Sequence, residues 1–286
     1  MTGAPTTNAQ IGDLSVRYAR SGGGPPIVLL HGLAEDHSSW QPVLSGFRNH
    51  TAFAVDLRGH GGSSCGHCDG TAEQLARDLT GFLEVVTGPA PVVGFSMGGS
   101  IALLGAAERP DMVTGLVVIA TSCVVGRAAA EFFSDRISMV ESGAMEELAT
   151  ALKEDTATQV LTEVDLDTLT AGRLAAIGDG AGYANAARAM MALRERPLTG
   201  RLAEVSCHVD VVSTDGDLFC PPRAGQMIVD GVADAAYHQI DGAGHLVTVD
   251  RPVALSALLD RLTSDMVGKG GSGPESDRDV LDEGAK

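Results

Sequence analysis

A serine lies between glycines at the end of an apolar run near the middle of the chain. Residues 92–100 read VVGFSMGGS, and residues 94–98 fit the pattern Gly-x-Ser-x-Gly. A sharp turn from a strand into a helix can lift such a serine above the edge of a sheet, and its neighbours must be small because the helix passes close by. Gly and Ser are also ordinary turn residues. Ser96 is therefore a candidate nucleophile only if a base, an acid and oxyanion donors accompany it.

Candidates for the acid and the base follow in the last third of the chain. Asp215 and Asp217 come after the apolar residues 209–212, and His245 ends the segment DGAGH. The chain order is therefore Ser, Asp, His. An unassisted serine hydroxyl is a poor nucleophile, but a histidine that takes its proton makes it able to attack a carbonyl. The residue types predict acyl-transfer chemistry.

Acyl transfer also develops a negative charge on oxygen, which needs two preorganised N–H donors. The amide of Met97, directly after Ser96, is one expected donor. The second is expected in His31-Gly32-Leu33-Ala34, which follows the first apolar run, and we assign it to Leu33. His31 is expected to fix this loop through hydrogen bonds, because His245 is the better candidate for a base.

A charged loop, DLRGHGGS, occupies residues 56–63. We expect Asp56 and Arg58 to pair beneath the site and to brace this loop. The segment CGHC follows, and such a motif also occurs in thioredoxin-type redox proteins, where it opens a helix. Five cysteines are no disulfide framework in a chain this long. We favour Cys65 and Cys68 as loop residues over a redox pair or a metal site; no metal or cofactor is predicted.

Short apolar runs alternate with helical patterns along most of the chain, which predicts the α/β class with a mostly parallel, doubly wound sheet. We expect the sheet and its helices in residues 1–125 and 201–263. Residues 126–200 read as helices only and are predicted to form a lid over the carboxyl ends of the strands, where ligands bind in such sheets; an ordinary helical subdomain is the alternative. Residues 264–286 are rich in Gly, Ser and acids and are predicted to be a disordered tail.

The expected strands are residues 15–19, 27–30, 53–55, 92–93, 116–119, 209–212 and 235–240, and the expected helices are residues 73–86, 97–108 and 253–262.

Taken together, these motifs resemble the α/β-hydrolase fold superfamily over roughly residues 14–262. The resemblance implies Ser96 as nucleophile, His245 as general base and Asp217 as the acid, because Asp217 begins the spacing Asp-x-x-x-Pro that is common in the family. Thr214 stands where the family often has Gly. Residues 182–189, followed by Leu198 and Leu202, are similar to the lid end of 3-oxoadipate enol-lactonases and cofactor-free haloperoxidases. Dehalogenases and epoxide hydrolases of this fold use an Asp nucleophile, so Ser96 disfavours them.

The resemblance implies a serine hydrolase that cleaves a small carboxylic ester, lactone or thioester through an acyl-enzyme. The same site could instead serve C–C hydrolysis, acyl transfer or a cofactor-free cyclisation or oxidation, and some members of the fold are non-catalytic ligand-binding proteins. An apolar lid would accept an apolar acyl or alcohol group. The candidate pocket residues are Trp40, Phe132, Phe133, Met139, Met190 and Met191.

The resemblance implies a small-molecule substrate, and the composition disfavours two other classes of partner. The formal net charge of −17 disfavours binding to nucleic acid, whose phosphates attract Lys and Arg. No apolar run approaches the roughly 18 residues of a membrane helix, so no membrane partner is expected. The first residues, MTGAPTTNAQ, lack a basic flank and an apolar core, which predicts a cytoplasmic protein. The sequence favours no particular oligomeric state.

Overall fold

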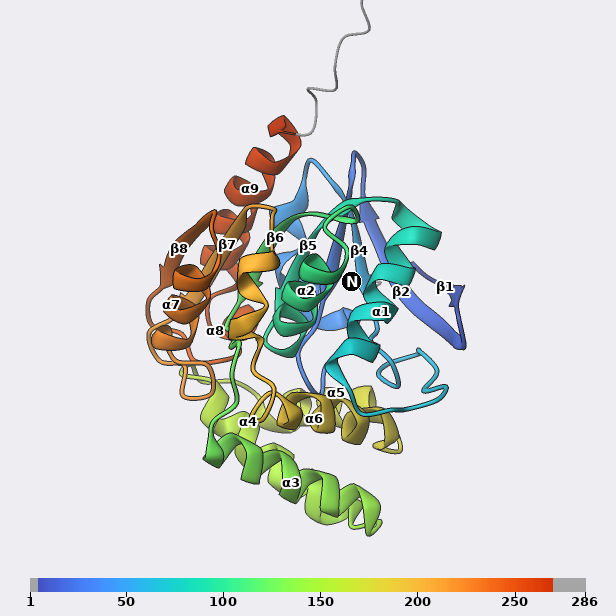
Figure 1. Ribbon diagram of the computed structural model, residues 1–286. Coiled ribbons are helices and arrows are strands. Elements are labelled where there is room, and N and C mark those ends of the chain that lie inside the picture. The colour runs from blue at the N-terminus through green and yellow to red at the C-terminus, as the bar shows by residue number, and fades with distance from the viewer. Residues whose placement is uncertain (1–4, 270–286) are drawn as a thin grey trace, which may run out of the picture.

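The computed structural model describes residues 5–269, and these contain an eight-stranded sheet (Figure 1). The strand order is β1-β2-β4-β3-β5-β6-β7-β8. Strands β3 to β8 run parallel to one another, whereas β2 pairs antiparallel with both β1 and β4 at one edge. The predicted α/β class with a mostly parallel sheet is therefore confirmed. The strands are Thr6–Ile11 (β1), Leu14–Gly22 (β2), Pro26–Leu30 (β3), Thr51–Val55 (β4), Ala90–Phe95 (β5), Val113–Ile119 (β6), Val209–Thr214 (β7) and Ala235–Ile240 (β8).

Helices cover both faces of the sheet, because the central strands are apolar on both sides. Alternate residues of one strand face opposite layers. Val28 and Leu30 of β3 belong to the core cluster that includes residues of α1, α2 and α7, whereas Ile27 and Leu29 belong to the cluster that includes residues of η1, α8 and α9. These helices are η1 (His37–Phe47), α1 (Ala72–Phe82, continued by η2, Leu83–Thr87), α2 (Met97–Glu108), α7 (Pro222–Gly231), α8 (Val247–Asp250) and α9 (Pro252–Lys269). Helix α9 extends six residues past the expected end of the core at residue 263; residues 270–286, the rest of the predicted tail, lie outside the described residues.

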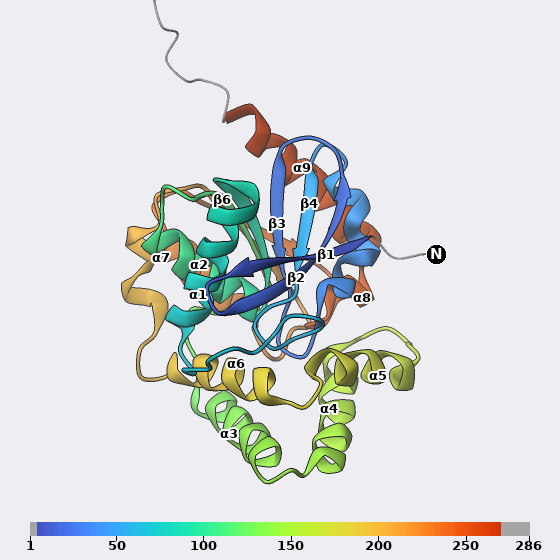
Figure 2. The same ribbon diagram turned by 90° about the vertical axis from the view of Figure 1, so that its right-hand side faces the viewer.

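Between β6 and β7 the chain leaves the sheet and forms a helical insert. Its helices are α3 (Arg127–Glu141), α4 (Met145–Gln159), α5 (Leu166–Ile177) and α6 (Ala181–Ala192), and the short helices η3 (Leu198–Gly200) and η4 (Leu202–Glu204) lead back to β7. In both views the insert lies at one end of the sheet, with α6 next to the core and α3 outermost, and α9 ends at the opposite side (Figures 1 and 2). Leu148, Leu152, Ile177 and Tyr183 form a small apolar cluster of the insert with Ala34.

None of the helices in residues 5–269 combines the length and the apolar character that crossing a bilayer requires.

Candidate active site

Ser96 lies at the turn from β5 into α2 in a conformation that a side chain seldom adopts. Its backbone has φ 52° and ψ −117°, in the positive-φ region that favours glycine. Small neighbours allow the turn. A Cβ at Gly94 would lie 2.5 Å from the carbonyl oxygen of Gly98, and a Cβ at Gly98 would collide with the backbone of Leu30 and His31. The strained turn places the Ser96 side chain at the carboxyl end of the sheet, beneath the insert.

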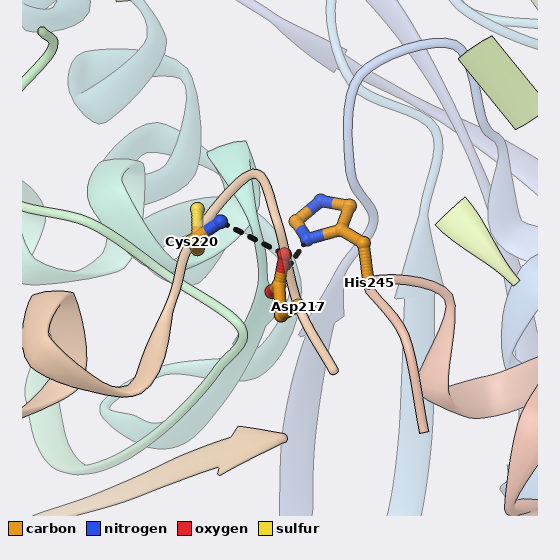
Figure 3. A group of neighbouring side chains, drawn as sticks. All are labelled: Asp217, Cys220 and His245. Atoms are coloured by element: carbon orange, nitrogen blue, oxygen red, sulfur yellow. Dashed lines mark hydrogen bonds and ion pairs between the residues drawn. The ribbon is translucent and has the colours of Figure 1, made fainter. Parts of the chain in front are cut away.

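Three loops bring Ser96, His245 and Asp217 into a hydrogen-bonded chain. The distance from Ser96 Oγ to His245 Nε2 is 2.9 Å, and that from His245 Nδ1 to Asp217 Oδ2 is 2.8 Å. Figure 3 shows the Asp217 carboxylate facing the imidazole ring of His245. The Asp217 carboxylate and the imidazole of His245 are both buried. In this arrangement Asp217 can fix the tautomer of His245 that leaves Nε2 free to accept the serine proton.

The other oxygen of Asp217 is held by backbone amides. Asp217 Oδ1 accepts a hydrogen bond of 2.8 Å from the N–H of Phe219 and another of 2.8 Å from the N–H of Cys220, the second of which is drawn in Figure 3. Asp215, the alternative acid, instead accepts from the N–H of Gly242 at 2.7 Å and so braces the histidine loop. Thr214, which replaces the family glycine, donates to the carbonyl of Gly244 at 2.8 Å. Both residues therefore tie the acid loop to the histidine loop.

Leu33 and Met97 line the same cavity as Ser96, and within residues 5–269 no acceptor outside regular secondary structure engages either backbone N–H. Met97 begins α2, where the first amides of a helix have no partner in the helix. The preceding loop is held from below by His31, whose Nε2 accepts from the N–H of Leu57 at 3.0 Å. Gly32 donates to Glu35 at 3.0 Å. These bonds fix the backbone that carries Leu33.

A cavity of about 330 Å³ lies between the sheet and the insert. Phe95 and Phe219 flank the imidazole of His245, with ring centroids at 5.2 and 5.4 Å. Of the predicted pocket residues, Phe132, Phe133 and Met190 line this cavity. The sequence analysis did not predict Phe95 and Phe219 as pocket residues, although Phe95 precedes Ser96 and Phe219 lies two residues after Asp217. It also missed Arg173, which nothing in the helical pattern distinguishes.

Three predicted pocket residues are placed elsewhere. Trp40 is buried in η1, where it packs with Val43 and Phe47 on the face of the sheet that η1, α8 and α9 cover. Met139 packs beside the small cluster of the insert, and Met191 is half-buried on α6 outside the cavity lining. Helix geometry explains the difference between the two methionines of α6. Neighbouring residues of a helix point in directions about 100° apart, so Met190 faces the cavity and Met191 does not.

The carboxylate, amide and guanidinium side chains of the cavity wall come from the insert: Asp155 and Gln159 from α4, and Arg173 from α5. Arg136 and Asp155 form a bidentate ion pair of 2.8–3.0 Å. Arg173 donates to Thr156 Oγ1 at 2.8 Å and to Gln159 Oε1 at 2.5 Å. Burial lowers the pKa of Arg173, yet a guanidinium still holds its proton at neutral pH. Arg173 is therefore a buried cation in the cavity wall.

The expected pairing of Arg58 with Asp56 is wrong. Arg58 donates to Asp78 of α1 at 2.7 Å and to Asp13 at 3.1 Å. Asp56 instead accepts from the backbone and ring of His37, each at 2.7 Å. Strand β4 ends at Val55, so the two residues lie on a turn and point toward different neighbours. Burial by itself would raise the pKa of Asp56, but hydrogen bonds from His37 and Gly62 outweigh it and lower that pKa.

Cys65 and Cys68 form a disulfide, so the favoured prediction that they are unbonded loop residues is wrong. Gly66 between them has φ 54°, and this glycine conformation tightens the four-residue turn. Arg58 donates to the carbonyls of Cys65 and His67, each at 2.8 Å. The disulfide therefore caps a turn that is fixed by the Arg58 ion pairs.

Among residues 5–269, two groups of side chains are spaced closely enough to share a cation: Asp217 with Cys220 and His245, and Asp36 with His37 and Asp56. In both groups a carboxylate already hydrogen-bonds the histidine. Burial raises the pKa of the Cys220 thiol, which keeps it protonated and a poor metal ligand. Hydrogen bonding accounts for the arrangement of both groups.

The chain matches known proteins over most of its length. A family model described as the alpha/beta hydrolase fold matches residues 25–252. A Mycobacterium tuberculosis protein provisionally named non-heme bromoperoxidase BpoC is 26% identical over 263 residues, which cover 86% of this chain and 96% of the relative. The provisionally named carbamate hydrolase RutD of Variovorax paradoxus is 26% identical over 253 residues, 84% of this chain and 92% of the relative. The enol-lactonase of Burkholderia xenovorans LB400 shares the fold, with a TM-score of 0.79 at 23% identity over 92% of this chain and 100% of that chain.

Proposed function

The chain belongs to the alpha/beta hydrolase fold family, and from this premise we propose that it is a serine hydrolase of a small carboxylic ester, lactone or thioester. The observation that carries the proposal is the continuous chain of hydrogen bonds from Ser96 Oγ through His245 to Asp217, at 2.9 and 2.8 Å. Esterases and an enol-lactonase among the solved structures of this fold support the substrate class.

The reaction begins when Ser96 attacks the substrate carbonyl. His245 Nε2 takes the hydroxyl proton, and Asp217 stabilises the imidazolium that forms. The amides of Leu33 and Met97 bind the developing oxyanion, and loss of one such donor costs about 3–4 kcal/mol of transition-state stabilisation in serine hydrolysis. Met97 also begins α2, and the positive end of that helix dipole favours the negative charge.

His245 then returns its proton to the leaving alcohol or thiol, and an acyl-enzyme on Ser96 remains. A water molecule that His245 activates in the same way releases the acid and restores the serine. The largely apolar cavity of about 330 Å³ suits a small acyl group. We assign the helical insert the role of a lid over this group.

The test is the intact mass of the protein after treatment with a fluorophosphonate, which bonds covalently to activated serines. We expect one adduct on the wild type and none on Ser96→Ala or His245→Ala, because the serine needs both its oxygen and its base. A panel of short acyl esters and lactones then measures turnover. An unlabelled wild type, or an adduct that persists in Ser96→Ala, would refute the proposal.

A further inference from the structure

Arg173 is a cation without an acidic partner in the wall of the active-site cavity. Its side chain comes from α5 in the insert, and the residue is only 7% exposed. Within residues 5–269 no ion pair within 4.0 Å engages its guanidinium. All of its acceptors are neutral: Thr156 and Gln159 at 2.8 and 2.5 Å, and the carbonyl oxygens of Leu33 and Ala34, both at the long distance of 3.4 Å. One guanidinium N–H is left over, because five donors meet four acceptors.

The nearby acids are engaged with other groups. Asp155 is paired with Arg136, and Glu35 accepts a hydrogen bond from the N–H of Gly32. Their fields reach Arg173 and favour its charged form, but neither carboxylate contacts it. A buried charge that has only neutral partners retains much of its desolvation cost, and an anion that enters the cavity would offset it.

The rest of the cavity wall explains why only one end of a ligand would be charged. Beside His245 the wall carries the rings of Phe95 and Phe219, whereas the carboxylate, amide and guanidinium side chains that line the cavity come from α4 and α5 of the insert: Asp155, Gln159 and Arg173. Tyr183 lies beside this group, and burial raises the pKa of its phenol to about 12, so its hydroxyl is a neutral donor. A ligand with an apolar middle and an anionic end matches this division of the wall.

We propose that the substrate of this site carries a carboxylate, which Arg173 binds while the ester or lactone carbonyl lies at Ser96. Guanidinium groups bind carboxylates through short, charge-assisted hydrogen bonds, so the pair would add orientation as well as affinity. The leftover N–H and the two long bonds to Leu33 and Ala34 are the donors that a carboxylate would engage. The inference rests on the proposed function of the same site.

The kinetic test uses pairs of substrates that differ only in the terminal group. Mono-p-nitrophenyl succinate, glutarate and adipate are compared with p-nitrophenyl butanoate, pentanoate and hexanoate. For at least one chain length we expect the wild type to prefer the carboxylate by tenfold or more in kcat/KM. In Arg173→Gln this ratio should fall at least tenfold, and Arg173→Lys should restore part of it. Arg188→Gln removes a half-buried arginine of α6 that pairs with Glu141 outside the cavity lining, and in this matched control the ratio should stay as in the wild type.

A binding test separates this inference from the proposed function. Ser96→Ala cannot form an acyl-enzyme, so calorimetry on it measures binding alone, with monomethyl glutarate against methyl pentanoate. We expect a Kd at least tenfold lower for the carboxylate ester, and loss of that difference in Ser96→Ala/Arg173→Gln. This result would uphold the carboxylate site even if the wild type hydrolysed no ester. Equal Kd values for the two methyl esters, or a preference for the carboxylate ester that persists in Ser96→Ala/Arg173→Gln, would overturn the carboxylate site. An equal fall of kcat/KM for the charged and the uncharged substrates in Arg173→Gln would also overturn it.

Discussion

His60 is a histidine that the fold keeps neutral. It is 1% exposed, its Nδ1 lies 3.0 Å from the carbonyl of Arg58, and its Nε2 has no partner among the described residues. Burial, assisted by the neighbouring His31, lowers its pKa from 6.5 to about 3. Between these two values the unfolded chain binds a proton that the folded protein does not bind, so the free energy of unfolding falls as the pH falls.

For the wild type we therefore expect a loss of stability below pH 6.5 that is steeper than in His60→Gln. The slope of the free energy of unfolding against pH should differ between the two proteins by about 1.4 kcal/mol per pH unit, the value for one bound proton. Urea unfolding at pH 7.5, 6.0 and 5.0 measures it. His67→Gln, which changes an exposed histidine of the next loop, should keep the wild-type slope. Equal slopes in wild type and His60→Gln would show that the buried ring is not the group that titrates.

At this scale the sequence predicted those residues whose role depends on a local pattern. Ser96, Asp217 and His245 each sit in a short motif, and the fold brings their side chains together. Partners set by long-range packing could not be read in the same way. Arg58 meets Asp78 and Asp13 because a helix and an earlier turn pack beside it. Trp40 follows the first loop in sequence, yet its direction depends on how η1 packs on the sheet.

Helix α2 passes so close to the end of β3 that an added methyl group at Gly98 would collide with the backbone there. A Cβ at Gly98 would meet the carbonyl of His31 at 2.7 Å, whereas a Cβ at Gly172 in α5 would have no atom within 4 Å. We expect Gly98→Ala to lower the free energy of unfolding by about 1–3 kcal/mol through overpacking. Gly172→Ala should raise it by roughly 0.5–1 kcal/mol, because alanine restricts the unfolded chain and favours helix.

Chemical unfolding of both variants tests this contrast, and fluorophosphonate labelling adds a second reading. Gly98→Ala shifts the turn that carries Ser96 and should slow labelling, whereas Gly172→Ala should not. A Gly98→Ala protein as stable as the wild type would mean that α2 moves away from β3 without cost.

Elements with strong periodicity or a full apolar run were predictable, whereas others were not, and β1, η1 and α7 show why. Strand β1 is mostly exposed at the edge of the sheet, and its sequence TTNAQI has little apolar signal. Segment η1 contains Pro42 inside its turns and lacks the pattern of a regular helix. Helix α7 begins with the pair Pro221 and Pro222, which reads as a loop, although proline fits the first turn of a helix.

The whole molecule carries a large excess of acid, with a formal net charge of −17 and a sequence pI near 4.7. Like charges on a compact surface repel one another, and salt screens them over a Debye length of about 10 Å at 0.1 M. We expect the melting temperature at pH 7.5 to rise when NaCl is raised from 10 to 200 mM. The rise should shrink near pH 4.7, where the net charge vanishes. Differential scanning calorimetry at both pH values measures it, and a fall with salt at pH 7.5 would contradict self-repulsion.

The hydrogen bond between Ser96 and His245 joins residues 149 positions apart, and the whole insert lies between them in sequence. During synthesis the turn that contains Ser96 is made early, whereas the loops that contain Asp217 and His245 are made only after α3 to α6. Helices form from local contacts, but parallel pairing of β7 on β6 must close the long connection that the insert occupies. Nascent or truncated chains that stop before β8 therefore contain Ser96 without the histidine that we propose as its base. Under that proposal, hydrolytic competence requires the final third of the polypeptide.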